Sequence, residues 1–163
     1  DLENYLSKMS KSIPSSELKL CENNAIDGVA GHYYHRYKDL EIPCVFKLEL
    51  PKELSVSEID ICLVLSNLLE NALEASMRTA PDKRRITLFA RMHSDNVVLI
   101  KVENFYNGVV KEKNGIFESS KHSGEGIGTQ SVRRIAEKGG GYCRFTQKDG
   151  IFTADVMLRG NSK

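Results

Sequence analysis

Two asparagines on a predicted helix are the first side chains in this sequence whose type and spacing suggest a chemical role. Asn67 and Asn71 lie four residues apart, and Glu74 and Arg78 continue the same polar ridge. Asparagine is a poor helix former, because its amide competes for backbone hydrogen bonds. Its amide oxygen is a neutral, hard ligand that suits a Mg²⁺ ion bound to phosphate. The ridge predicts either such a site or a helix face that is solvated or bridged by buried polar groups.

A glycine-rich segment directly before another predicted helix is the second candidate. It runs from Gly124 to Thr129 and reads GEGIGT. Glycines let backbone N–H groups approach a phosphate closely, and a helix N-terminus adds partial positive charge. The spacing is not that of a Walker loop, and a long polar segment rather than a strand precedes it, which excludes a Rossmann fingerprint. Taken alone, the segment is compatible with a phosphate cradle and with a flexible helix entrance.

The elements that would position these residues follow from apolar periodicity and turn residues. Residues at 61, 65, 68, 72 and 75 form one apolar stripe on the asparagine helix, which predicts a core-facing surface. The segment 105–127 is polar and predicts a mobile loop. In chain order we expect a helix at 24–39, a strand at 42–50, a helix from Ser55 or Ser57 to about 78, strands at 86–92 and 97–103, a helix at 128–138, and a hairpin of 142–147 with 151–158 turning at 149–150.

This order predicts an α+β fold, a two-layer α/β sandwich with a mixed, mostly antiparallel sheet covered on one face by helices. With 163 residues the chain fits one domain. Its 23 basic and 22 acidic residues give a net charge of +1, which argues against nucleic acid as the main partner. The four cysteines form no CxxC pair, so we expect reduced thiols and a cytosolic compartment. The sequence has no apolar stretch long enough to span a membrane.

The first 16 residues have a pattern of their own. Apolar residues at 2, 5, 6 and 9 recur at helical spacing, and a Ser/Pro cluster at 12–16 then ends the pattern. The sequence begins at Asp1, inside this helical pattern. We therefore expect a piece of a longer protein in which 1–16 are the end of an upstream helix and a junction.

The two motifs together resemble the GHKL ATPase superfamily: an NxxxN helix, two strands, and a polar loop that ends in GxGxG before a helix. The segments LLENALEAS and GEGIGTQSVRRIAEKGGG are most similar to catalytic domains of sensor histidine kinases of the Gram-positive, quorum-sensing type. The resemblance covers about residues 18–160. It implies a Bergerat-type ATP-binding catalytic domain at 17–163, with 1–16 ending the dimerisation helix.

The resemblance also implies roles for individual residues. Asn71 would bind Mg²⁺, and Asn67 would lie beside the triphosphate of ATP. Lys121 is expected either to reach a phosphate or to be a solvated lysine of the lid. The lid hinge and phosphate cradle would comprise Gly124, Gly126 and Gly128, followed by Thr129.

The sequence departs from the superfamily at two positions. Most relatives carry Asp-x-Gly-x-Gly after the strand that ends here at Val102, and their Asp accepts a hydrogen bond from the adenine amino group. Asn104 replaces that Asp, and its amide oxygen is still an acceptor. Hydrolysing members have a Glu four residues before the metal Asn, where this chain has Asn67. An amide cannot act as a general base, so the sequence favours phosphoryl transfer over hydrolysis.

None of the four histidines has the sequence context of a phosphoacceptor; they are His32, His35, His93 and His122. We therefore expect the acceptor histidine on dimerisation helices upstream. The parent protein would be a membrane-anchored homodimer with this monomeric domain in the cytoplasm, and a response regulator would be its second partner. The alternatives are a serine kinase of the anti-sigma-factor type with the same fold and a non-catalytic nucleotide-sensing or interaction module.

Overall fold

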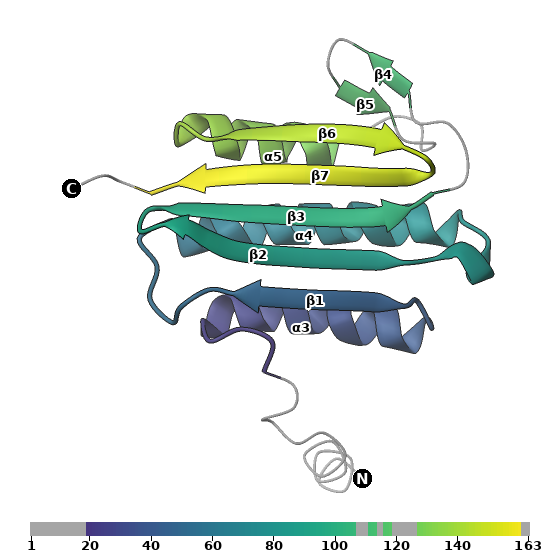
Figure 1. The fold of residues 1–163 in the computed structure, drawn as a ribbon, viewed down its shortest axis with the longest axis horizontal. Helices are drawn as coiled ribbons and strands as arrows, with labels where there is room; N and C mark the ends of the chain where they lie inside the picture. The colour runs from purple at the N-terminus through teal and green to yellow at the C-terminus, as the bar shows by residue number, and fades with distance from the viewer. Residues whose placement is uncertain (1–18, 107–110, 114–115, 119–126, 161–163) are drawn as a thin grey trace, which may run out of the picture.

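The computed structural model describes residues 19–106 and 127–160, together with the short strands 111–113 and 116–118. A five-stranded sheet in the order β1-β2-β3-β7-β6 carries three helices on one face, which lie behind the sheet in Figure 1. β1 is parallel to β2, and the other neighbours are antiparallel. This confirms the predicted α+β sandwich. The elements are α3 (Asn24–Asp39), β1 (Cys44–Glu49), α4 (Glu58–Met77), a 3₁₀ turn (Pro81–Lys83), β2 (Ile86–Ser94), β3 (Val97–Phe105), β4 (Lys111–Lys113), β5 (Ile116–Glu118), α5 (Ile127–Lys138), β6 (Tyr142–Lys148) and β7 (Ile151–Arg159).

The two long helices begin at side chains that cap them. The Asn23 side chain accepts a hydrogen bond from the backbone N–H of Ile26 at 3.0 Å. The Ser57 hydroxyl accepts one from the N–H of Asp60 at 3.2 Å. Each cap satisfies an N–H group that has no partner within the helix. The predicted α3 is therefore confirmed, and of the two serines proposed as the start of α4 it is Ser57 that caps the helix.

The core lies between the sheet and α4, the middle helix. Four positions of the predicted stripe are buried, at 61, 65, 68 and 72, but Ala75 is only half-buried. The buried surface passes instead through Leu69, Leu73 and Ser76. Because α4 lies between α3 and α5, its buried surface is wider than one stripe and includes residues that face the neighbouring helices.

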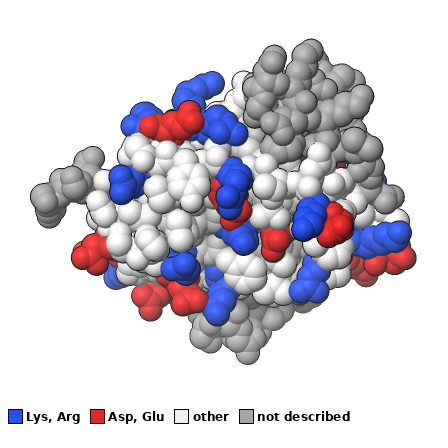
Figure 2. Space-filling view, turned by 45° about the horizontal axis from the view of Figure 1, so that its top comes forward, with Lys and Arg blue, Asp and Glu red and all other residues white. Residues whose placement is uncertain are grey.

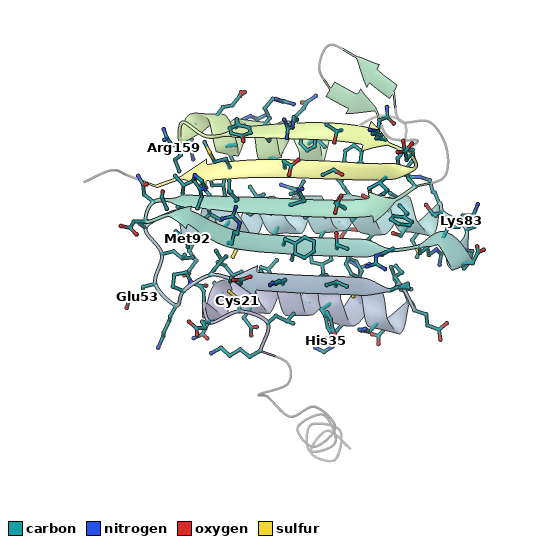
Figure 3. All side chains as sticks on the ribbon, in the orientation of Figure 1. Cys21, His35, Glu53, Lys83, Met92 and Arg159 are labelled. Atoms are coloured by element: carbon teal, nitrogen blue, oxygen red, sulfur yellow. The ribbon has the colours of Figure 1, made fainter. Side chains whose placement is uncertain are left out.

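Side chains of each strand alternate between the helix-covered face and an open face of the sheet. On β2, Ile86, Leu88 and Ala90 are buried beneath the helices, whereas Phe89 and Arg91 are exposed on the other face. Figure 3 shows this alternation along the strands. The alternation decides which side chains of the strands can contact α4.

Three predicted boundaries differ from the structure. β3 extends to Phe105, so Asn104 lies inside the sheet and not after the strand. Within the predicted loop 105–127, β4 and β5 form an antiparallel pair. β1 is shorter than expected, because its pairing with β2 covers only residues 44–49.

The C-terminal hairpin turns as predicted. Asp149 and Gly150 have φ angles of 54° and 77°, the left-handed conformation that a two-residue hairpin turn requires.

The four cysteines are free thiols, also as expected. Burial raises the pKa of the Cys143 thiol above its usual range, which keeps it protonated near neutral pH.

Candidate functional site

The two motifs meet where α4 and α5 lie side by side. A Cβ atom built on Gly128 would lie 3.1 Å from Nδ2 and 3.2 Å from Oδ1 of Asn71. These distances are shorter than side chains normally tolerate, so the glycine lets the start of α5 rest directly on the asparagine amide. Residues that are far apart in the sequence thus lie side by side on the helical layer.

The packing of α5 explains why these groups meet. Val132 and Ala136 are buried in the core shared with α4, and Thr129, one residue after Gly128, is also buried. At the other end of α5, a Cβ on Gly141 would collide with the carbonyl oxygen of Met157. The last glycine of the GGG triplet therefore lets the chain turn closely from α5 into the sheet, which fixes the helix against β7.

Asn71 and Asn67 are both half-buried on α4. Side chains of this intermediate exposure can reach a ligand at the surface of the helical layer. The distances place Gly128 against Asn71, while the roles of both Asn67 and Asn71 stay predictions. Three predicted site residues, Lys121, Gly124 and Gly126, lie outside the described residues.

Asn104 lies at the end of β3, on the helix-covered side of the sheet. It is 4% exposed and stands between Ile86 and Phe152 on the neighbouring strands. Its Nδ2 donates to the carbonyl oxygen of Phe105 at 3.2 Å. Donation by the amide nitrogen leaves the side-chain oxygen as the group that can accept from a ligand.

Thr79 lies beside Asn104 and is not among the residues predicted from the sequence. Its hydroxyl is 2.7 Å from the carbonyl oxygen of Ala75 and 3.4 Å from that of Phe105. It thereby links the C-terminal end of α4 to the end of β3, beside Asn104. A buried threonine just after a helix carries no distinctive sequence signal, because such residues often only close the last helical turn.

Glu70 turns toward α3. Its Oε1 accepts a hydrogen bond from the Tyr33 hydroxyl at 3.2 Å and lies 3.4 Å from Nη1 of Arg36. Burial, and then the charge of Glu70, raises the pKa of Tyr33 to about 12. The carboxylate is therefore engaged by α3, on the side of α4 away from the Asn71–Gly128 contact.

The chemistry of these residues fits a cation brought in by a phosphate ligand. The described part of the chain holds no group of three or more His, Cys, Asp or Glu side chains able to bind a metal. Asn71 offers one neutral, hard oxygen, which suits Mg²⁺ when phosphate oxygens and water supply the other ligands. A metal site built from protein ligands alone is not present in these residues.

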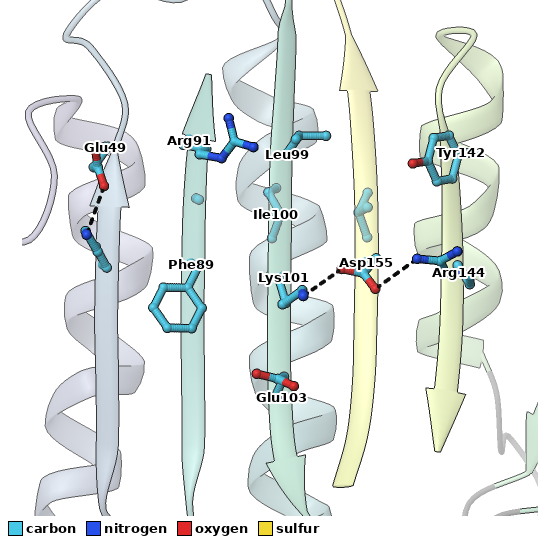
Figure 4. A pocket seen from close by; sticks show the side chains of 13 residues that line it. Glu49, Phe89, Arg91, Leu99, Ile100, Lys101, Glu103, Tyr142, Arg144 and Asp155 are labelled. Carbon is cyan, nitrogen blue, oxygen red and sulfur yellow. Dashed lines mark ion pairs between the residues drawn. The ribbon is translucent and has the colours of Figure 1, made fainter. Parts of the chain in front are cut away.

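A hollow on the open face of the sheet is separate from this site. Figure 4 shows its lining, in which Asp155 lies 3.8 Å from both the Lys101 ammonium and the Arg144 guanidinium. Figure 2 shows basic and acidic side chains interspersed over this face. The hollow contains none of the predicted site residues and lies across the sheet from the helices. Its charges are those of a solvated surface with local ion pairs.

The fold is that of histidine kinase catalytic domains. The chain is similar to the catalytic domain of the histidine kinase ThkA, with 17% identity, a TM-score of 0.63, and coverage of 86% of this chain and 94% of that one. The mycobacterial sensor histidine kinase MprB gives 17% identity, a TM-score of 0.60, and coverage of 86% and 96%. ThkA in complex with the response regulator TrrA matches with 19% identity, a TM-score of 0.62, and coverage of 85% and 40%.

A family model gives the more specific assignment. The model of the GHKL domain matches residues 56–159, which include both motifs and more than half of the chain. The chain therefore belongs to the GHKL domain family, as its motifs predict. Among curated proteins, none matches the chain.

Proposed function

We propose that this chain binds Mg-ATP and donates the γ-phosphate to a histidine on upstream dimerisation helices, as the catalytic domain of a sensor histidine kinase. The observation that carries the proposal is the close approach of Gly128 to the Asn71 amide, because it brings a side chain whose oxygen could bind a metal next to a helix N-terminus. Membership of the GHKL family and the likeness to histidine kinase catalytic domains support it.

In this proposal each residue has a distinct task. The Asn71 oxygen holds Mg²⁺, Asn67 lies beside the triphosphate, and the backbone N–H groups at Gly128 and Thr129 bind phosphate oxygens. The Asn104 oxygen accepts from the adenine amino group. The metal ion neutralises charge on the phosphates, and phosphoryl transfer otherwise requires mainly positioning. Lys121, Gly124 and Gly126 would complete the cradle.

Transfer is favoured over hydrolysis for two reasons. Asn67 occupies the position from which a glutamate would activate water, and an amide cannot take a proton. Glu70, the carboxylate nearest in sequence to Asn71, is held by Tyr33 and Arg36 of α3. We infer that ATP bound here is kept for another acceptor.

The proposed partners are the dimerisation helices of the same protein and a response regulator. The complex of ThkA with TrrA supports the second, since it shows a kinase of this fold with such a partner. We further propose a membrane-anchored, homodimeric parent with this domain on the cytoplasmic side. No helix in the described residues is long and apolar enough to cross a membrane. The proposal includes no nucleic-acid partner.

Calorimetric titration with a non-hydrolysable ATP analogue tests the metal site. Asn71→Ala should abolish Mg²⁺-dependent binding without unfolding the domain, because Asn71 lies at the site and not in the core. The matched control is Asn24→Ala, an exposed asparagine in the first turn of α3. Equal affinities of the wild-type chain and Asn71→Ala would contradict the metal assignment.

Labelled ATP distinguishes the kinase from its alternatives. The purified chain should bind ATP, hydrolyse it slowly and remain unlabelled, and added dimerisation helices should acquire acid-labile, base-stable phosphate. Because Asn67 stands where the hydrolysing family members have a glutamate base, this chain should hydrolyse ATP more slowly than they do by a factor of roughly 10²–10⁴. Rapid phosphate release would instead support a hydrolase, and acid-stable label on a serine substrate would support the anti-sigma-factor type. Absence of nucleotide binding would support an interaction module.

A further inference from the structure

The side-chain amide of Asn104 is held in one orientation by a backbone carbonyl group. The side chain is almost completely buried at the end of β3, and its Nδ2 donates to the carbonyl oxygen of Phe105 at 3.2 Å. A carbonyl oxygen can only accept a hydrogen bond, so only the NH₂ end of an amide can face it. The opposite orientation would bring two oxygens together and leave both without a donor. The carbonyl therefore determines which end of the amide faces away from it.

The Phe105 carbonyl is itself fixed in direction. It shares one peptide group with the N–H of Tyr106, which donates to the carbonyl oxygen of Gly150 at 2.9 Å. Because a peptide group is planar, this bond also sets the direction of the carbonyl. The Thr79 hydroxyl lies 3.4 Å from the Phe105 oxygen, and Arg84 Nε donates to the carbonyl oxygen of Thr79 at 2.9 Å. The acceptor is therefore held by the β6–β7 turn and by the residues that follow α4.

A carboxylate at position 104, as in the superfamily pattern, could not make the same contact. An ionised carboxylate has no hydrogen to donate, so one of its oxygens would lie against the Phe105 oxygen. Two buried acceptors in contact leave both groups without a partner, which is costly. A protonated carboxyl group differs, because its O–H can donate to the carbonyl while its second oxygen accepts, as the amide does. Position 104 thus requires both a donor and an acceptor.

The surroundings of position 104 are unfavourable for a negative charge. The side chains beside it on β2 and β7 are apolar, Ile86 and Phe152. Arg84 is engaged by a backbone carbonyl. Glu103 lies on the open face of β3 (Figure 4), where it accepts hydrogen bonds from threonines of both neighbouring strands. On α4, Glu74 is a further acidic residue of the polar ridge. Burial among these groups would raise the pKa of an introduced carboxyl group above its ordinary value of about 4.

We propose that the Phe105 carbonyl positions the Asn104 amide, so that this chain requires asparagine where the superfamily pattern has aspartate. With Nδ2 held by the carbonyl, Oδ1 is the atom that accepts from a ligand. This arrangement suits a purine with an amino group at C6 and disfavours one with an oxygen there, because two acceptors would then meet. The statement about the ligand rests on the proposed function, whereas the requirement for the amide does not.

Thermal melts of Asn104→Asp without nucleotide test the requirement for the amide. At pH 8 the melting temperature should lie at least about 4 °C below that of the wild-type chain. The raised pKa of the introduced carboxyl group makes this loss complete above that pKa, and the loss should diminish as the pH falls toward about 4. The difference from the wild-type chain should therefore shrink between pH 8 and pH 5. The matched control is Asn24→Asp, an exposed position in the first turn of α3, which should show no such loss.

Calorimetric titration tests the consequence for the nucleotide. Asn104→Asp should bind ATP about tenfold more weakly than the wild-type chain at pH 8 and approach it at pH 5. Comparison at the same pH cancels the titration of ATP and of the acidic residues that both chains share. Asn104→Ala should lose affinity by the same factor at both pH values, because alanine has no proton to exchange. The wild-type chain should bind inosine triphosphate, which has an oxygen at C6, at least about tenfold more weakly than ATP.

The outcomes separate this proposal from the proposed function. Equal melting temperatures of Asn104→Asp and the wild-type chain at pH 8 would overturn the proposal, and so would a loss that does not change with pH. An ATP affinity of Asn104→Asp at pH 8 equal to or above that of the wild-type chain would overturn it too. Unfolding of this variant at pH 8 with recovery at pH 5 would support it. If the wild-type chain binds no ATP, the proposed function fails, and the melting temperatures still decide whether the amide is required.

Discussion

The two faces of the sheet differ in what they contribute. On the helix-covered face, Leu88 and Ile100 are completely or almost completely buried. On the open face, Phe89 remains 38% exposed and Asp155 forms only long, partly solvated ion pairs. Burial of apolar surface stabilises a fold far more than exposed ion pairs do. The helix-covered face therefore contributes most of the stability of the domain, and it also carries the predicted site residues.

The largest effect should come from the covered face. Leu65→Ala removes a completely buried side chain between α4 and the sheet, and we expect the free energy of unfolding to fall by about 3 kcal/mol. Leu63→Ala, on the exposed surface of the same helix, is the control and should change it by less than about 1 kcal/mol. Urea denaturation followed by circular dichroism measures both. Similar losses would show that the two sides of α4 are not distinct.

Gly128→Ala tests the site without disturbing the core. The new methyl group would press on the Asn71 amide, so nucleotide affinity should fall about tenfold, or about 1.4 kcal/mol. The control is Gly28→Ala on α3, where a Cβ meets nothing within 4 Å. It should stabilise the domain by up to about 1 kcal/mol, because alanine is the better helix former. Calorimetric titration would contradict the assignment if both variants bound nucleotide equally.

A smaller effect should appear at alkaline pH. The pKa of Tyr33 is raised to about 12, mainly by burial of its side chain. An unfolded tyrosine releases its proton near pH 10, so the unfolded state gains stability first as the pH rises. The contribution of Tyr33 is fully present below pH 10 and should be lost between about pH 10 and about pH 12. Thermal melts across this range should decline less in Tyr33→Phe than in the wild-type chain.

The smallest effect should come from the open face. Asp155→Asn removes the carboxylate shared by Lys101 and Arg144, both of which are largely exposed. The free energy of unfolding should change by less than about 0.5 kcal/mol, and the change should diminish further in high salt. A loss of several kcal/mol, measured by urea denaturation, would mean that the open face is not a solvated surface.

Local features of the sequence determined the helices and the C-terminal turn. The caps at Asn23 and Ser57 and the apolar stripe of α4 act within a few residues, so they can be read from neighbours in the chain. The Asp149-Gly150 turn is likewise local, because it needs only two residues that tolerate positive φ. The same reasoning identified Asn71 and Gly128 as chemically unusual positions.

Only the tertiary structure decided which of these residues meet. Strand β7 lies between β3 and β6, and this order places Asn104 inside the sheet, a position that the sequence pattern missed. On α4, Leu69 and Leu73 are buried although they lie outside the predicted stripe, because α3 and α5 flank this helix, whereas Ala75 of the stripe is only half-buried. The contact of Gly128 with Asn71 joins residues on separate helices. Periodicity and capping act over a few residues, whereas such a contact depends on how the helices pack across the sheet.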